Sequence, residues 1–222
     1  MGADADAEGL ARVPGYARWR GQGELLISFE QRPRVWRFRA DGRFVRDEPL
    51  PAPWGEVAAY RAPNQALEAV AWHPRWGLIF GSEQPLRAQP PGTLPLRSTR
   101  GAAWDLAGNP TLGGSGLVDI AAQRDGTLLL LERAYEAASG RTVITLSRMA
   151  PDRAAPDRAR RGAQAPWIAE RLVAFDSAEG WALDNFEGLA VLPGQRVLLV
   201  SDDNESATQR TLLLCLRLLP RR

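Results

Sequence analysis

A short unit recurs four times along the chain, and this repetition restricts the fold more than any other feature. Each copy has an acidic residue, an apolar strand, a turn, a second apolar strand and a second acidic residue. The clearest copy is DNFEGLAVLPGQRVLLVSDDN, residues 184–204. The other copies begin at DAEGLARV (6–13), NQALEAVAW (64–72) and GLVDIAA (116–122). Such a pattern predicts one sheet-forming element repeated several times.

The repeat predicts an all-β chain built as a β-propeller. The first acids of successive units lie about 60, 51 and 68 residues apart, within or somewhat beyond the spacing of propeller blades. Each unit is followed by a further alternating stretch, such as RVWRFRADGRF or RTVITLSRM. Asp41-Gly42 and Asp125-Gly126 are hairpin-turn signals. We therefore expect about four antiparallel blades of a partial or small propeller, as one domain over residues 5–218. A β-sandwich is the alternative, but it does not predict an acid at the same place four times.

The last unit also gives an expectation about the core. Leu189, Val191, Leu198 and Val200 alternate along its two strands, so we expect these side chains to be buried.

Composition excludes several classes of function. The net charge of +2 supplies no global field for nucleic acid. No stretch approaches the ~20 apolar residues that span a bilayer. The first residues, MGADADAEGL, lack the apolar core of a signal peptide. Cys215 is the only cysteine, so no internal disulfide can form.

The repeated acids are the strongest candidates for a site. Equivalent positions of propeller blades converge around the axis, so carboxylates there would repel unless a cation or arginines lie between them. Carboxylate oxygens suit Ca²⁺ or Mg²⁺. The first acids, which are the candidate metal ligands, are Glu8, Glu68, Asp119 and Glu187. Further candidates at the ends of the second strands are Glu30, Glu83, Glu132, Asp202 and Asp203. Alternatively, each acid caps a strand end or pairs with a neighbouring arginine.

Nucleophilic catalysis has little support in the sequence. His73 is the only histidine, and it lies in AWHPRW, which is typical of a turn after a strand. The GGSG stretch fails the nucleophile-elbow pattern because Leu117 stands where the last glycine is required. The chain also lacks a Gly-rich phosphate loop and a zinc-type Cys/His cluster.

Several of these segments resemble one known family. DNFEGLAVLPGQRVLLVSDDN followed by QRTLLLCLRL resembles the C-terminal signature of the phytase-like, "esterase-like activity of phytase" family. DAEGLARV, LEAVAW and GLVDIAAQRDGTLLLLERAY resemble earlier parts of the same family, so the resemblance covers roughly residues 5–218. It implies a β-propeller, usually exported in bacteria to the periplasm or the medium, and hydrolysis of phosphate or carboxylate esters. The family normally has one or more blades before DAEGLA, which we therefore expect to be missing here together with any signal peptide, and a cytoplasmic location stays open.

The resemblance leaves two functions to compare. In β-propeller phytases, acids on the channel bind calcium, and calcium helps to hold phosphate. The first hypothesis is therefore metal-assisted hydrolysis of a small anionic ester, with Ca²⁺ as cofactor. Candidates to hold the anionic oxygens are Arg32, Arg34, Arg133 and Arg210. The second hypothesis is a non-catalytic propeller that binds a ligand or partner, which the absence of a recognisable base–nucleophile pair favours.

Overall fold

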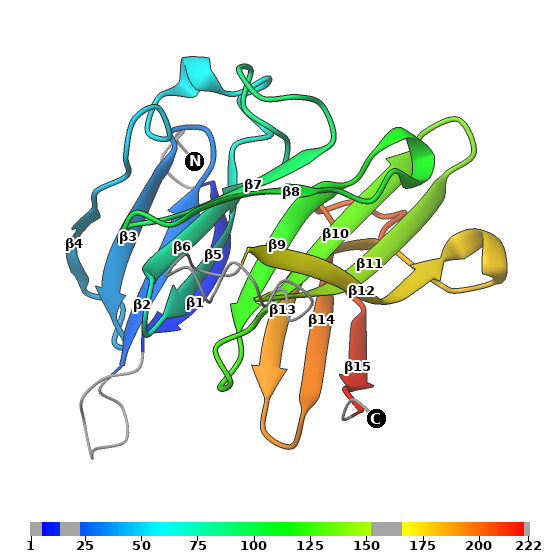
Figure 1. Cartoon of the computed structure of the whole chain (residues 1–222). Helices are drawn as coiled ribbons and strands as arrows, with labels where there is room; N and C mark the ends of the chain where they lie inside the picture. Colours follow the sequence, from blue (N-terminus) through cyan, green and yellow to red (C-terminus); the bar gives the residue numbers. More distant parts are fainter. Residues whose placement is uncertain (1–5, 14–22, 152–165, 220–222) are drawn as a thin grey trace.

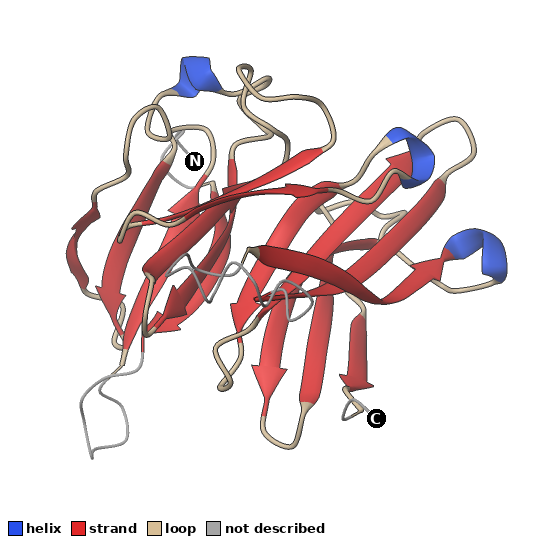
Figure 2. Cartoon of the chain, viewed as in Figure 1, coloured by secondary structure: helices blue, strands red, loops and turns tan. Residues whose placement is uncertain are grey.

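The structure is a computed structural model that describes residues 6–13, 23–151 and 166–219. These residues are almost entirely strand and turn, and the short helices are single 3₁₀ turns (Figure 2). The 3₁₀ turns are η1 (Val57–Ala59), η2 (Thr111–Gly113) and η3 (Ser177–Glu179). In the described ranges, no helix has the length and apolar character needed to cross a lipid bilayer.

Four antiparallel sheets follow one another along the chain, and each is one blade of a β-propeller (Figure 1). Blade 1 contains β1 (Ala7–Val13), β2 (Glu24–Phe29), β3 (Arg34–Arg39) and β4 (Phe44–Glu48). Blade 2 contains β5 (Leu67–His73), β6 (Gly77–Ser82), β7 (Thr93–Ser98) and β8 (Ala103–Ala107). Blade 3 contains β9 (Gly116–Ala122), β10 (Leu128–Glu136), β11 (Arg141–Pro151) and β12 (Trp167–Asp176). Blade 4 contains β13 (Asn185–Leu192), β14 (Arg196–Asp202) and β15 (Leu213–Arg217). The predicted four-bladed all-β architecture is confirmed.

The predicted hairpin turns form because glycine supplies the required backbone conformation. Gly42 has φ of 85° and Gly126 has φ of 81°, in the left-handed region that glycine adopts without steric cost. The aspartates before them accept hydrogen bonds from the amides two residues on, at 3.1 Å to Arg43 and 3.0 Å to Thr127.

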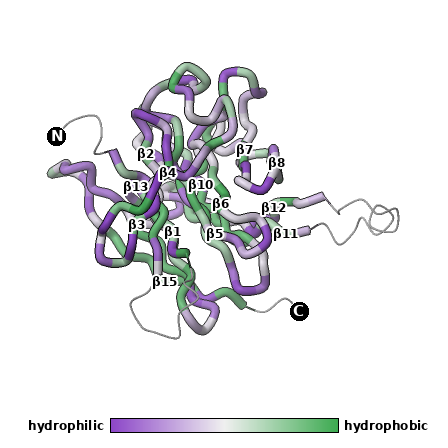
Figure 3. The backbone as a smooth tube through the Cα atoms, turned by 90° about the vertical axis from the view of Figure 1, so that its left-hand side faces the viewer, coloured by the Kyte–Doolittle hydropathy of each residue, from purple (hydrophilic) through white to green (hydrophobic). Residues whose placement is uncertain are grey.

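Neighbouring blades pack face to face in chain order, through β1 against β5, β5 against β9 and β9 against β13. Three clusters of buried side chains fill the three interfaces. Leu26 and Val35 pack with Leu67 and Phe80 between blades 1 and 2. Ile79, Leu96, Leu117 and Leu130 fill the second interface. Leu129, Leu146, Phe186 and Leu199 fill the third. In Figure 3 hydrophobic colouring follows much of the strands, while many turns are hydrophilic.

The first and last blades each have a second face that no neighbouring sheet covers in the described part of the chain. On blade 1 this face carries the aromatic set of Phe29, Trp36, Phe38 and Phe44, and Phe44 is 54% exposed. On blade 4 Leu213 is 69% exposed.

For the second strand of the last unit, the sequence predicted the wrong set of alternating side chains to be buried. Leu189 is buried as expected, but Val191 is 36% exposed, and Val197 and Leu199 occupy the core. Leu198 and Val200 are half-buried and lie on the opposite face of β14. Both faces of this strand are apolar, so its sequence pattern did not reveal which face meets blade 3.

Candidate functional site

The repeated acids of blades 1, 2 and 4 lie at irregularities in the innermost strands. Leu67 pairs with Ser82 and Ala69 with Gly81, so Glu68 is an extra residue in β5. Glu187 has the same place in β13, between the Phe186–Ser201 and Gly188–Val200 pairs. The pairing of β1 with β2 also shifts at Glu8 and Gly9. A bulge leaves its extra residue outside the ladder and redirects the side chain.

Blade 3 departs from this equivalence by one residue. Leu117 pairs with Glu132 and Asp119 with Leu131, so Val118 is the bulged residue. Leu117, the residue before the bulge, pairs with Glu132, and the residue that follows Glu132 is Arg133. In blades 1, 2 and 4 the residue that follows the corresponding partner is an acid, namely Glu30, Glu83 and Asp202. Asp119 and Glu132 are therefore each displaced by one residue from the positions of the acids in the other blades. At the position of the second acid, blade 3 has the cation Arg133.

Asp119 and Glu132 serve local structure. The Asp119 carboxylate accepts hydrogen bonds from the amides of Ile120 and Leu189, each at 2.7 Å, and so ties blade 3 to blade 4. Burial raises the pKa of Asp119 to about 8, and the two N–H donors act in the opposite direction. Glu132 accepts from the Ser115 hydroxyl at 2.5 Å and from the Asn109 amide at 2.8 Å, which fixes the loop before β9.

The other acids form one cluster, which we call the axial cluster: Glu8 and Glu30 from blade 1, Glu68 and Glu83 from blade 2, and Glu187 from blade 4. Glu30 accepts from the Ala66 amide at 3.0 Å, and so ties blade 1 to the residue that precedes β5 of blade 2.

Burial and mutual repulsion raise the pKa values across the axial cluster. Burial raises the pKa of Glu8 to about 7, with added repulsion from Glu30, Asp6 and Glu187. Burial also raises the pKa of Glu68, and the charges of Glu8, Glu30 and Glu83 add to it. Burial raises the pKa of Glu83 and of Glu187, while Arg133 lowers both. The cluster therefore has more carboxylates than the local positive charge can balance.

Arg133 is the cation that blade 3 places against these acids. One guanidinium nitrogen donates to the Glu187 carboxylate and to the side-chain oxygen of Asn185. Another lies 3.6 Å from the Glu83 carboxylate. Asn185 also donates to Glu187 at 2.8 Å, so Arg133 and Asn185 together fix that carboxylate.

The other predicted anion-binding arginines lie elsewhere. Arg34 stacks over Phe29 and Trp36, at 4.2 and 4.4 Å from the ring centroids, on the uncovered face of blade 1. It also donates to the carbonyl of Arg32, in the turn between β2 and β3, at 2.9 Å. The main chain of Arg210 is tied to Asp184 and Ser201, and its side chain is exposed.

The two remaining acids lie at the end of β14. Asp202 pairs with Asn185, whose side chain donates to Glu187, so Asp202 lies close to the axial cluster. Asp203 accepts from the Glu205 amide at 3.1 Å and from the Thr211 hydroxyl at 3.0 Å, and so shapes its own loop.

Three carboxylates of blade 1 have the spacing of a metal site. Asp6, Glu8 and Glu30 each offer an oxygen, and these oxygens lie within 4.8 Å of one another. Such a set of hard oxygen donors fits Ca²⁺. Sequence reasoning missed Asp6, although the repeated acids of DADAEG were a signal for it. It also missed Asn185.

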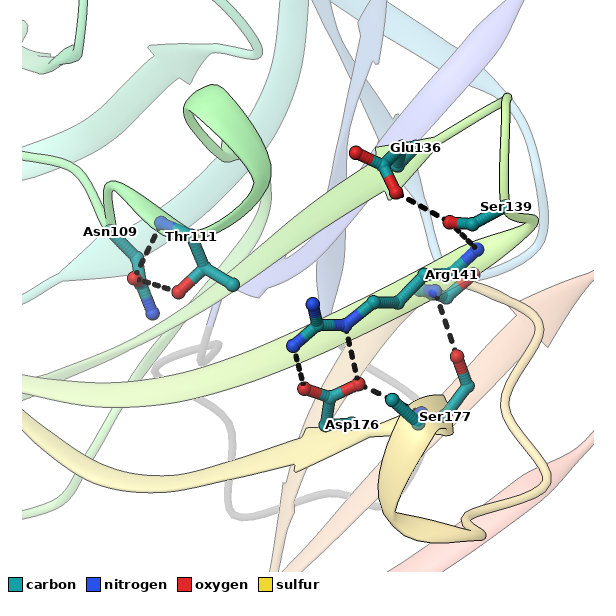
Figure 4. A network of polar contacts seen from close by, with 9 residues as sticks. Asn109, Thr111, Glu136, Ser139, Arg141, Asp176 and Ser177 are labelled. Carbon is teal, nitrogen blue, oxygen red and sulfur yellow. Dashed lines mark hydrogen bonds and ion pairs between the residues drawn. The ribbon is translucent and has the colours of Figure 1, made fainter.

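Figure 4 shows a separate polar network at the outer side of blade 3. Asp176 accepts from two guanidinium nitrogens of Arg141, at 3.0 and 2.6 Å, and caps η3 through the Ala178 amide at 2.9 Å. Ser139 donates to Glu136 at 2.5 Å in the β10–β11 turn. These contacts close turns, and they account for the acids of this region without a ligand.

The family model described as "Phytase-like: Esterase-like activity of phytase" matches residues 1–205. The chain belongs to this phytase-like family. A comparison of the phytase-like chain with curated proteins finds no match.

Among solved structures, the phytase-like chain is similar to virginiamycin B lyase from Staphylococcus aureus. The identity is 8% and the TM-score 0.35, with 95% of this chain and 70% of that chain covered. A catalytically inactive variant of the same lyase, solved with quinupristin, gives 10% identity and a TM-score of 0.33, with 84% and 78% covered. At these values we draw nothing about activity from the likeness.

Proposed function

We propose that the axial cluster of this phytase-like propeller binds Ca²⁺, and that the bound ion helps to hold a phosphate or related ester for hydrolysis. The observation that carries the proposal is the donor set of Asp6, Glu8 and Glu30, whose oxygens lie within 4.8 Å of one another. Glu8 and Glu30 belong to the axial cluster, and their pKa values are raised by burial and further by repulsion from neighbouring carboxylates, Asp6 among them. A divalent cation would relieve that repulsion.

The residues of the cluster have distinct parts in this proposal. A bound Ca²⁺ would neutralise negative charge on the ester and lower the pKa of a coordinated water. Burial raises the pKa of Glu8 to about 7, so Glu8 would release its proton on binding Ca²⁺ near neutral pH. Arg133 is the cation beside the cluster, and an anionic ester would compete with Glu83 and Glu187 for its guanidinium group. A Ca²⁺-dependent activity also fits the periplasmic or secreted location that the family resemblance implies.

Calorimetric titration with Ca²⁺ tests the binding step. At pH 8 we expect the wild type to bind Ca²⁺, and we expect Glu8→Gln to weaken binding at least tenfold because a neutral amide is a poorer ligand. Glu132→Gln is the matched control, since Glu132 is a buried acid held by Ser115 and Asn109 outside the cluster. Equal affinity for wild type and Glu8→Gln would contradict a site on these residues.

Turnover is tested separately, with p-nitrophenyl phosphate, p-nitrophenyl acetate and phytate as substrates, each with Ca²⁺ and with a chelator. The proposal expects calcium-dependent release of product that is reduced in Glu8→Gln and unchanged in Glu132→Gln. Calcium binding without turnover on any of the three would reject hydrolysis of these esters.

That last result would support the second candidate, a non-catalytic propeller that binds a ligand through its metal site. One observation favours it: the only histidine serves the fold. The ring nitrogen Nδ1 of His73 accepts from the amides of Arg75 and Trp76, at 3.2 and 3.3 Å. Nε2 therefore carries the proton and donates to the carbonyl of Gly126 at 3.0 Å. His73 thus joins blades 2 and 3 and is not free to act as a base.

A further inference from the structure

A groove lies at the other end of the blades from the axial cluster. Glu68 stands at the start of β5, whereas Trp76 lies in the turn after its end. Here β8 of blade 2 and β12 of blade 3 contact each other. Between them is a groove of about 320 Å³. Its lining is Trp76, Trp104, Trp167, Arg100, Pro166 and the small residues 101–103. We call it the tryptophan groove.

The three indole rings form a continuous aromatic wall. The Trp76 and Trp104 centroids are 5.5 Å apart with the rings at 87°, and those of Trp104 and Trp167 are 5.8 Å apart at 54°. All three side chains are half-buried, and they cap the hydrophobic core between blades 2 and 3. The wall therefore packs on the core at its inner side and is partly exposed at its outer side.

Two polar atoms of this wall lack partners among the residues that the structure describes. They are the buried indole nitrogens of Trp76 and Trp167. Buried tryptophan N–H groups usually find an acceptor, so this pair is unusual for a folded protein.

The charge at the groove is positive. Arg100 lines it and is held in place by the carbonyls of Pro74 and Arg75, at 2.7 and 3.1 Å. The guanidinium of Arg75 stacks over Trp76 at 4.5 Å from the ring centroid. None of the described residues that line the groove is acidic. Aromatic walls with one oriented charge are typical of small-molecule sites, and arginine selects carboxylate or phosphate oxygens.

We propose that the tryptophan groove binds a small aromatic anion, with the ring against the indoles and the anionic group facing Arg100. This site is independent of the axial cluster and of any Ca²⁺ bound there. A flat ring matches the aromatic wall, and a neutral ring would leave the charge of Arg100 unused.

Calorimetric titration of the full chain with phenyl phosphate, in the presence of EDTA, tests the proposal. We expect phenyl phosphate to bind at least tenfold more tightly than benzyl alcohol, which lacks the charge, and than inorganic phosphate, which lacks the ring. Arg100→Gln should weaken phenyl phosphate binding about tenfold and leave benzyl alcohol binding unchanged. Arg87→Gln, an exposed arginine of the same blade that donates to the Arg61 carbonyl, is the matched control and should bind as the wild type does.

The aromatic wall is tested with a pair of variants at one position. Trp104→Phe keeps a ring and should retain most of the affinity, whereas Trp104→Ala should lose it. Unchanged circular dichroism is required of both, and if Trp104→Ala does not fold, Arg100→Gln decides the matter. Two results would overturn the proposal: equal affinity in wild type and Arg100→Gln, or loss of binding in Glu8→Gln, which would place the ligand at the axial cluster.

Discussion

Replacing Arg133 with glutamine removes the cation from the axial cluster, and the structure sets the size of the effect. Arg133 faces both Glu83 and Glu187, with side chains 18%, 17% and 28% exposed. A pair of unit charges about 4 Å apart is worth about 4 kcal/mol at an effective dielectric constant of ~20. Removing one partner of a fully buried pair costs about 3–5 kcal/mol. Because these side chains are partly solvated, we expect Arg133→Gln to lower the free energy of unfolding by about 2–3 kcal/mol at pH 8.

The pH dependence of the stability lost in Arg133→Gln distinguishes the contribution of charge from that of packing. Arg133 lowers the pKa values of Glu83 and Glu187, so its removal raises them further above those of the unfolded chain. When carboxyl groups have raised pKa values in the folded state, the free energy of unfolding of the protein falls as the pH rises. The cost of Arg133→Gln should therefore be large at pH 8 and small at pH 5, and saturating Ca²⁺ should recover part of it at pH 8.

The assay is urea unfolding of wild type and variant at both pH values, followed by circular dichroism. Arg97→Gln is the control, because Arg97 is 21% exposed but pairs with one half-exposed acid, Asp105, at 2.9 Å. We expect that variant to lose less stability than Arg133→Gln at pH 8. A cost for Arg133→Gln that is near zero, or equal at pH 5 and pH 8, would refute the role of Arg133 as counter-ion.

Three further predictions concern packing and protonation. Gly9→Ala should lower the free energy of unfolding by at least about 1–3 kcal/mol through overpacking, because the added Cβ would lie 2.3 Å from the Glu68 carbonyl oxygen. Thermal melts test this, with Gly55→Ala as the control because the nearest atom to its Cβ is 3.9 Å away. Leu199→Ala should cost about 2–5 kcal/mol in urea unfolding, and Leu198→Ala clearly less; equal costs would mean that the assigned phase of β14 is wrong. Because the pKa of Glu8 is about 7, Ca²⁺ affinity should rise from pH 6 to pH 8 with release of protons, as calorimetry in buffers of different ionisation enthalpy would show. A heat of Ca²⁺ binding that is the same in all buffers would contradict this prediction.

Much of the architecture could be predicted because the repeat fixes it. Four copies of one strand–turn–strand unit, with glycine at the hairpin turns, define the number of blades and the inner strand of each. Glu8, Glu68 and Glu187 could likewise be grouped, because each stands one residue after the first apolar or small residue of its inner strand.

The grouping failed at blade 3 for a physical reason. A bulge shifts side chains by one position, and the sequence GLVD places an acid one residue beyond the bulge. Asp119 thus looks equivalent to the other acids but turns its carboxylate to backbone amides. Arg133 was found as a candidate, but its partners could not be, since they come from blades 2 and 4.

The count of blade interfaces has a consequence for how the molecule opens. In the described part of the chain, four sheets are joined by three buried clusters, so blades 2 and 3 have two neighbours each while blades 1 and 4 have one. Stability in such a stack is close to a sum over nearest-neighbour contacts, and its ends open before its middle. Amide hydrogen exchange should therefore be fastest in the outer sheets and slowest in β6 and β10. Since Glu8, Glu30 and Glu187 lie on the two outer sheets, fraying at either end would disassemble the axial cluster while the centre of the stack stayed folded.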